Sequence, residues 1–353
     1  MSARWQGVAL LLVVLVCIGV LAWLVRSKLL RMRHQLQPEL HILDPPSTPA
    51  LPRRGAGGAF RLLSLQSGGT YLLASLRYLE RVEEEARPGW LESVSCFSGS
   101  SMGALIAVLL AQGHTPGALM GLLTAEAPHV LRRSGIWQLL TLGGLSSAMY
   151  GTRRLEAWLD QMFGDMTLAS LSRYVVIPTM NLRKAQPVVY HNLPGSPFMG
   201  IQIKDVIAQS CAVPVLMPPR NGHLDGALVS PNPALHAALL LLHHVPGLRA
   251  RDLRALTLGH RWVLGAVDVP ESPGLLWYLM HFKHFLHAYM FSAQRSLDMR
   301  LEEILGDHIH NVLFDLPVYP GSVLSGWRLN KAVLQQVTQM GDQYDLPSEQ
   351  ILA

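Results

Sequence analysis

Two short apolar runs with different spacing follow each other where the chain reaches residue 60. Residues 60–65, FRLLSL, predict a strand, and residues 72–84 carry leucine and valine at helical spacing. A small-residue turn at residues 67–70, SGGT, separates them. The order recurs at residues 93–113, where SVSCF predicts a strand before a glycine-rich turn and a buried helix. The pattern therefore predicts two successive strand–turn–helix units.

A longer apolar run lies near the start of the chain, at residues 7–25, and carries no charge. A helix of this length crosses a hydrocarbon core of about 30 Å. The run also exceeds the apolar region of a cleaved signal peptide, so we expect a membrane anchor. Arg4 alone precedes the run, whereas four basic residues follow within residues 26–33. The positive-inside rule then predicts a single-pass membrane protein whose catalytic domain faces the cytoplasm.

The segment after this run is rich in proline and then in glycine and alanine. Proline at this density removes backbone donors and blocks helix propagation, so residues 35–59 predict an extended linker. We see no internal repeat after it. We therefore divide the chain into an anchor with its basic flank (1–34), a linker (35–59) and one globular domain (60–353).

Composition narrows the class of protein. The chain has 353 residues, of which 50% are hydrophobic and 15% are charged, so it can bury one large core. A net charge of +5 could indicate a nucleic-acid partner, but no basic block is interleaved with aromatic residues, and we expect none. The cysteines Cys17, Cys96 and Cys211 lack metal-ligand spacing. They predict buried thiols, with neither a disulfide nor a zinc site.

The turn in the second unit, Gly99-Ser100-Ser101-Met102-Gly103, has the pattern G-x-S-x-G. Between a strand and a helix, this pattern predicts a nucleophile elbow, in which small residues at Gly99 and Gly103 permit a strained turn. The elbow exposes its central serine, Ser101, at the helix N-terminus. The alternative is a flexible loop without a chemical role.

A nucleophilic serine requires a base, and the stretch Asp225-Gly226-Ala227 offers one. Glycine after aspartate indicates a tight turn that presents the carboxylate, which could accept the serine proton. The alternative is an ordinary Asp-Gly turn. Glycines at 68 and 69 would let backbone N–H groups approach a ligand oxygen, although a plain strand-to-helix turn explains them equally well.

Taken in order, the turn at residues 67–69, the elbow at 99–103 and the D-G-A at 225–227 resemble the patatin-like phospholipase family. The similarity covers residues 60–265. It implies a three-layer α/β fold with a central, mostly parallel sheet. It also implies a Ser101–Asp225 dyad that cleaves acyl esters of lipids through an acyl-enzyme. Oxyanion donors would be the N–H groups of Gly68, Gly69 and Met102, with no cofactor and no metal.

The first turn departs from the family's usual D-G-G-G-x-R-G. Gln66 stands in place of aspartate, Ser67 of glycine, Tyr71 of arginine and Leu72 of the last glycine. These changes leave open a catalytically impaired protein that acts as a membrane-tethered scaffold. If the turn lines the site, Tyr71→Arg should match or exceed the parent's turnover.

A second alternative is a Ser-His-Asp α/β-hydrolase, in which His236, His243 or His260 would be the base. Replacing each histidine separately by alanine would distinguish it from the dyad.

Residues 275–291, LLWYLMHFKHFLHAYMF, are rich in aromatic residues and histidine. We predict a core helix of the C-terminal layer, with an interfacial helix that admits lipid from a bilayer as the alternative. The spacing of its three histidines does not gather them on one helical face, so we expect no metal site.

Overall fold

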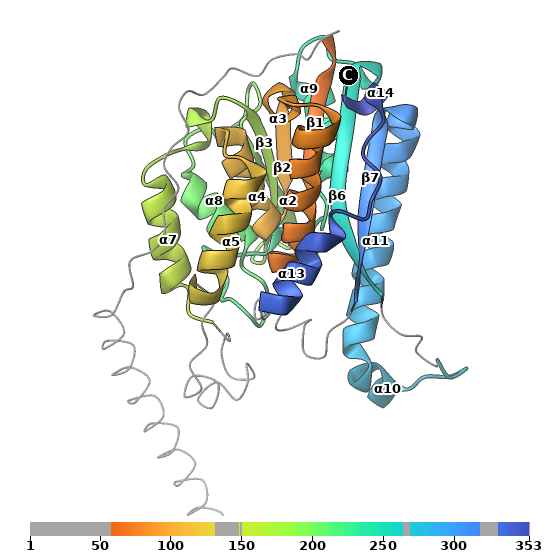
Figure 1. Cartoon of the computed structure of the whole chain (residues 1–353). Helices are drawn as coiled ribbons and strands as arrows, with labels where there is room; N and C mark the ends of the chain where they lie inside the picture. The colour runs from red at the N-terminus through yellow and green to blue at the C-terminus, as the bar shows by residue number, and fades with distance from the viewer. Residues whose placement is uncertain (1–57, 131–147, 149, 264–268, 318–330, 353) are drawn as a thin grey trace, which may run out of the picture.

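The computed structural model describes residues 58–130, 148, 150–263, 269–317 and 331–352 (Figure 1). Within these ranges one sheet has the strand order β4-β3-β2-β1-β6-β7, and β5 pairs with β3. β4 and β5 run antiparallel to β3, and the other neighbouring pairs are parallel. The strands are β1 (Phe60–Leu65), β2 (Cys96–Gly99), β3 (Tyr174–Asn181), β4 (Gln186–His191), β5 (His223–Leu224), β6 (Leu253–Val263) and β7 (Ile309–Pro317).

Helices connect these strands and cover both faces of the sheet (Figure 1). The α-helices are α2 (Leu72–Arg81), α3 (Trp90–Ser93), α4 (Met102–Gln112), α5 (Pro116–Val130), α7 (Arg153–Phe163), α8 (Ile203–Ser210), α9 (Ala234–His244), α10 (Leu275–Met280), α11 (Phe282–Leu305), α13 (Lys331–Met340) and α14 (Glu349–Leu352). Shorter helical turns are η3 (Gly69–Tyr71), η4 (Val82–Ala86), η6 (Leu168–Ser170), η7 (Gly226–Leu228), η8 (Ala250–Asp252) and η9 (Gly306–His308).

Side-chain alternation along β1 separates two hydrophobic cores. Leu63 and Leu65 join the cluster that includes the buried faces of α2, α4 and α5. Phe60 and Leu62 point to the other side, where they meet α9 and the C-terminal half of α11. Because successive residues of a strand face opposite sides, one fully buried strand serves both cores. The result is a three-layer α/β arrangement with a mostly parallel sheet, as the resemblance to the patatin-like phospholipase family implied.

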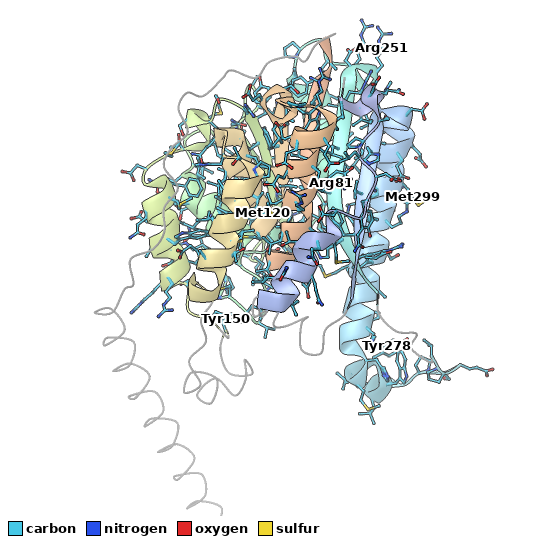
Figure 2. All side chains as sticks on the ribbon, in the orientation of Figure 1. Arg81, Met120, Tyr150, Arg251, Tyr278 and Met299 are labelled. Atoms are coloured by element: carbon cyan, nitrogen blue, oxygen red, sulfur yellow. The ribbon has the colours of Figure 1, made fainter. Side chains whose placement is uncertain are left out.

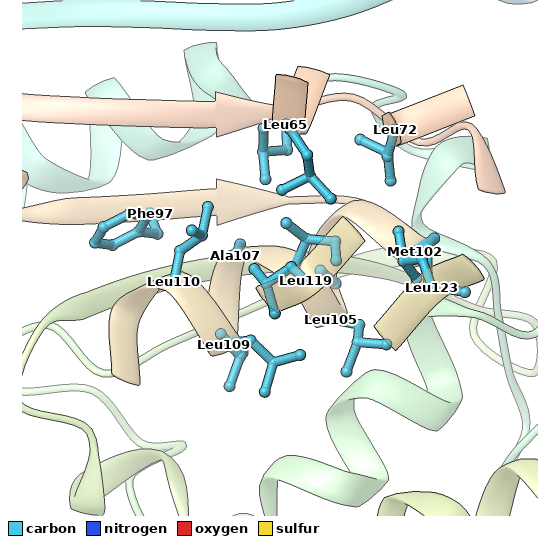
Figure 3. Packing of buried hydrophobic residues seen from close by; sticks show 14 of the residues in the cluster. Leu65, Leu72, Phe97, Met102, Leu105, Ala107, Leu109, Leu110, Leu119 and Leu123 are labelled. Carbon is cyan, nitrogen blue, oxygen red and sulfur yellow. The ribbon is translucent and has the colours of Figure 1, made fainter. Parts of the chain in front are cut away.

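The strand–turn–helix units are present where the sequence placed them. β1 has the predicted bounds, and α2 begins at Leu72 and continues into the π-helical turn η4. α4 covers Met102–Gln112 and ends at Gly113, whose φ of 100° suits glycine. β2 begins three residues later than predicted, at Cys96, because α3 occupies the chain through Ser93. Figure 3 shows the apolar side chains of β1, β2, α4 and α5 packed together.

The prediction of a single-pass membrane protein with a cytoplasmic domain is corrected. Across the described ranges, no helix is long and apolar enough to cross a bilayer. The apolar helix α4 has 11 residues and is therefore about 17 Å long, well short of a hydrocarbon core of about 30 Å. α11 has 24 residues but includes Arg295, Asp298 and Arg300. The predicted anchor itself, residues 7–25, lies outside the described residues.

The prediction that residues 275–291 form a core helix is also wrong. They form α10 and the first turns of α11, and α10 has no buried residue. Leu275 is 76% exposed. The C-terminal half of α11 supplies its packing against the sheet, through Leu301 and Leu305, whereas α10 extends past the end of the sheet (Figure 1). Apolar composition alone indicated burial, but the helix continues beyond the layer that could cover it.

Candidate active site

The turn between β2 and α4 holds Ser101 in a backbone conformation that residues with side chains rarely adopt. Its φ is 56° and its ψ is −129°. The Ser101 N–H donates to Ser210 Oγ at 3.1 Å, and Ser210 Oγ donates to the carbonyl oxygen of Pro178 at 3.0 Å. These two bonds anchor the strained residue to α8 and β3. The side chain of Ser101 is thereby placed at the N-terminus of α4, as in a nucleophile elbow.

Glycine is required on both sides of Ser101 because backbone segments pass very close together. A Cβ at Gly99 would collide with the carbonyl oxygen of Gly103. A Cβ at Gly103 would lie 2.7 Å from the carbonyl oxygen of Leu65 and 2.9 Å from that of Gln66. The backbone at the two ends of the elbow is therefore in close contact, and the elbow packs directly against the end of β1.

Asp225 lies on the next turn along the site, at the start of η7, and is 2% exposed. Its Oδ1 accepts a hydrogen bond from the Ala227 N–H at 2.8 Å. Its Oδ2 has no hydrogen-bond partner among the described residues. A Cβ at Gly226 would collide with the carbonyl oxygen of Pro178 and lie 2.8 Å from Ser100 Oγ. The absence of that Cβ lets the Asp225 turn approach the elbow.

Burial raises the pKa of the Asp225 carboxyl to about 7. The Ser101 hydroxyl and the Ala227 N–H oppose this shift, since both favour the charged carboxylate. The Ser101 hydroxyl therefore faces Asp225, although no hydrogen bond of normal length joins them, which is common before substrate binds. A carboxyl with this pKa ionises near neutral pH and is a stronger proton acceptor than an ordinary aspartate.

This pKa predicts the pH dependence of catalysis. Since only the ionised carboxylate accepts a proton, we expect kcat/KM for a soluble ester to rise with pH and to level off above about 7. The measurement is hydrolysis of p-nitrophenyl butyrate by the full chain, from about pH 5 to about pH 9. A profile that is already level at about pH 5 would contradict the raised pKa of Asp225, because the carboxyl would then ionise like an exposed aspartate.

The turn between β1 and α2 places Gly68 and Gly69 next to the elbow. The N–H groups of Gly68, Gly69 and Met102 donate to no acceptor within the described part of the chain. They are consequently available to a ligand oxygen. The Ser67 N–H donates to the carbonyl oxygen of Pro231 at 2.8 Å, which ties this turn to the loop that follows Asp225. The predicted site residues thus lie on turns, or at the strand and helix ends beside them, that contact one another.

A buried polar network lies beneath these turns. Ser98 Oγ donates to Ser64 Oγ at 2.7 Å, and Ser64 Oγ donates to Asn232 Oδ1 at 2.5 Å. Asn232 Oδ1 also accepts from the Ala234 N–H at 3.2 Å. The network joins β1, β2 and the start of α9, so the three loops of the site rest on a common hydrogen-bonded base.

A family model described as patatin-like phospholipase matches residues 63–238, which is roughly half of the chain. The matched segment begins in β1 and includes the elbow, the Gly68 turn and Asp225. The chain belongs to the patatin-like phospholipase family.

Individual relatives agree with this assignment. CotR of Bacillus subtilis, described as a candidate sporulation hydrolase, is 28% identical over 185 residues, which cover 50% of this chain and 55% of the relative. Protein teg of Priestia megaterium is 27% identical over 183 residues, which cover 49% of this chain and 54% of the relative. The chain therefore spans about half the length of each of these two relatives. The cUMP-AMP-activated phospholipase of Escherichia coli is 25% identical over 272 residues, which cover 73% of this chain and 79% of the relative.

Solved structures give a more distant similarity. VipD from Legionella pneumophila has 13% sequence identity and a TM-score of 0.40, with 82% of this chain and 69% of that chain covered. A likeness at this level carries no information about substrate or mechanism.

The departure from the family's first turn at Gln66 has a structural explanation. Its Nε2 donates to the carbonyl oxygen of His260 at 3.2 Å, and its Oε1 accepts from the His260 N–H at 3.0 Å. A Cβ at Gly259 would collide with Gln66 Oε1. The Gln66 amide therefore pairs with the backbone of β6 and holds the Gly68 turn against it.

Tyr71 is a core residue, which corrects the expectation for Tyr71→Arg. It is 2% exposed, and its ring lies 5.8 Å from that of His260. Arginine at this position would bury a charge in an apolar cluster, so a loss of stability is expected rather than a gain in turnover. Leu72 is equally buried, which explains why an apolar side chain replaces glycine there.

The sequence alone did not identify three residues that support the site: Gln66 as a clamp, Ser210 as the acceptor for Ser101, and His260 as the neighbour of Gly68. A Cβ at Gly68 would collide with Cε1 of His260, so this glycine is needed for packing as well as for any donor role. In the sequence, the only sign of these contacts was the departure from the family pattern at position 66, where glutamine stands in place of aspartate. The two alternatives, a scaffold without activity and a Ser-His-Asp hydrolase, receive no support from the fold or the relatives.

Proposed function

We propose that this chain is a serine acyl hydrolase that cleaves acyl ester bonds of phospholipids or related lipids with Ser101 and Asp225. One observation carries the proposal: a serine on a strained strand-to-helix turn faces a buried carboxyl whose pKa is raised to about 7. Family membership supports the reaction class, and the E. coli relative's name supports phospholipid as the substrate class.

In the first half of the reaction, Ser101 Oγ attacks the ester carbonyl carbon while Asp225 Oδ2 takes the serine proton. The negative charge that develops on the carbonyl oxygen would be held by the N–H groups of Gly68, Gly69 and Met102. Collapse of this intermediate breaks the ester C–O bond, and Asp225 returns the proton to the departing alcohol oxygen. The acyl group is then bonded to Ser101 Oγ.

In the second half, a water molecule attacks the acyl carbon and gives a proton to Asp225. The same donors stabilise the second oxyanion, and its collapse releases the fatty acid. Ser101 Oγ recovers the proton from Asp225, so the enzyme returns to its starting state. The free Oδ2 of Asp225 suits this role because Oδ1 is occupied by the Ala227 N–H.

The test uses the full chain with phospholipids and neutral glycerides presented in mixed micelles, and it measures the release of fatty acid. We expect release from at least one lipid class and covalent labelling of Ser101 by a fluorophosphonate. Ser101→Ala is the control for both measurements. Failure of the fluorophosphonate to label Ser101, together with no release from any lipid, would contradict the proposal.

A further inference from the structure

We propose that α10 and the first turns of α11 dock this protein onto the surface of an anionic lipid bilayer. This segment, residues 275–289, is called the apolar tip below. The inference rests on the proposed function, because a lipid hydrolase must reach substrates that are held in a bilayer. It concerns a surface that lies outside the catalytic turns.

The apolar tip exposes an unusual concentration of large apolar side chains. Six of them are more than half exposed to solvent: Leu275, Leu276, Leu279, Met280, Phe285 and Tyr289. Other exposed large apolar residues in the described ranges are scattered, such as Leu182 and Leu239. Single exposed leucines are ordinary, but a continuous group on one short segment marks an interaction surface.

The C-terminal half of α11 is attached to the body of the protein by apolar packing and by buried hydrogen bonds. Leu301 and Leu305 lie in the cluster against the sheet. Gln294 is buried and accepts from the Asn232 N–H at 2.9 Å through its Oε1, and its Nε2 donates to Asp298 at 2.6 Å. The C-terminal half of α11 is therefore firmly attached to the body, and the tip extends from it past the end of the sheet (Figure 1).

The tip lies at the same end of the molecule as the candidate active site. Ser101 follows the carboxyl end of β2, and β2, β1 and β6 are parallel. In the sequence, α11 comes between β6 and β7, which are also parallel to each other. Because the chain leaves β6 at the carboxyl edge of the sheet and must return to the opposite edge to begin β7, the N-terminus of α11 lies at the carboxyl edge. Figure 2 shows Tyr278 beyond the body at this end and Met299 further along α11, beside the sheet. A bilayer that receives the tip would therefore face the end that carries Ser101.

The composition of the tip favours a lipid surface over a protein groove. It combines aliphatic residues with Trp277, Tyr278 and Tyr289, the aromatic types that partition to a membrane interface. No acidic residue occurs between Glu271 and Asp298, whereas one lysine, one arginine and three histidines do. This charge pattern is complementary to anionic headgroups. The convex, protruding shape of α10 also suits insertion into a surface (Figure 1).

The test places an environment-sensitive fluorophore on the tip. In the full chain with Ser101→Ala and Cys17→Ser, Leu279→Cys carries the dye NBD, and Met299→Cys on the attached half of α11 is the matched control. Leu279 is 63% exposed and Met299 is 49% exposed, whereas Cys96 and Cys211 are buried and should not react. The local probe reports on the tip alone, whatever other segments of the chain contact the vesicle.

With vesicles of phosphatidylglycerol and phosphatidylcholine, we expect a blue shift and a rise in emission at position 279 and no change at 299. Vesicles of phosphatidylcholine alone should require a higher lipid concentration. Adding Leu276→Gln and Met280→Gln should raise the lipid concentration for half-maximal change at least about tenfold. Leu239→Gln, which alters an exposed leucine on α9, should leave it unchanged.

Three results would overturn the proposal. One is no spectral change at 279, or an equal change at 299. Another is an apolar environment at 279 before vesicles are added, since the chain itself would then cover the tip. The third is a change that depends on protein concentration without lipid, which would indicate a second copy as the occupant. Because Ser101→Ala removes catalysis, this outcome is independent of the fatty-acid release that tests the proposed function.

Discussion

Ser101→Ala should reduce ester hydrolysis by about 10³-fold or more, because no other hydroxyl occupies the central position of the elbow. The strained backbone at residue 101 places its side chain at the N-terminus of α4, next to Asp225. Initial rates on p-nitrophenyl butyrate and on phospholipid micelles measure the loss. Melting temperature should change little, since one partly enclosed hydroxyl is removed without a large cavity.

Ser100→Ala is the matched control for this substitution. Ser100 is fully buried, and its Oγ has no hydrogen-bond partner among the described residues, so its removal should leave most of the activity. Ser101, by comparison, is 4% exposed. An equal loss in both variants would leave the nucleophile unassigned, and full activity in Ser101→Ala would exclude the elbow from the chemistry.

Asp225→Asn should lower hydrolysis by a similar order, about 10³-fold, while the protein remains folded. Asparagine keeps the shape of the side chain and can still accept the hydrogen bond from the Ala227 N–H, but it cannot take a proton from Ser101. Fluorophosphonate labelling of Ser101 should slow in parallel. Full activity in Asp225→Asn would contradict the dyad.

The same substitution should increase stability at high pH. The pKa of Asp225 is about 7 in the folded protein and 3.8 in the unfolded chain, so the folded state binds the proton more tightly. The contribution of the Asp225 carboxyl to the free energy of unfolding is therefore fully present below pH 3.8 and is lost as the pH rises through about 7. Above that pH, the buried carboxylate costs up to about 4 kcal/mol, and asparagine removes this cost.

Melting temperatures of the parent and of Asp225→Asn, measured from about pH 5 to about pH 8.5, check this prediction. The advantage of the asparagine variant should grow with pH over that range. A constant difference would mean that the carboxyl titrates alike in the folded and unfolded chains. A variant that is both inactive and more stable at alkaline pH would indicate that the fold accepts a cost in stability at this position.

Local sequence determined the elements that carry the candidate site. The bounds of β1, the start of α2 and the bounds of α4 follow from apolar spacing and from glycine at the turns. The elbow was predictable because part of its requirement is also local: a Cβ at Gly99 would collide with the carbonyl oxygen of Gly103, four residues further along the chain. Asp225-Gly226 was recognised for the same reason, as a tight turn that presents a carboxyl.

Only the tertiary structure decided which residues surround these turns. The pairing of Gln66 with His260 joins positions 194 residues apart, and the bond from Ser101 to Ser210 spans 109 residues. No local pattern encodes such partners. The raised pKa of Asp225 depends on burial beneath several elements, and the exposure of residues 275–289 depends on where the sheet ends beneath α11. Periodicity and turn chemistry describe what a segment can form, whereas desolvation and long-range contacts arise only when the layers are assembled.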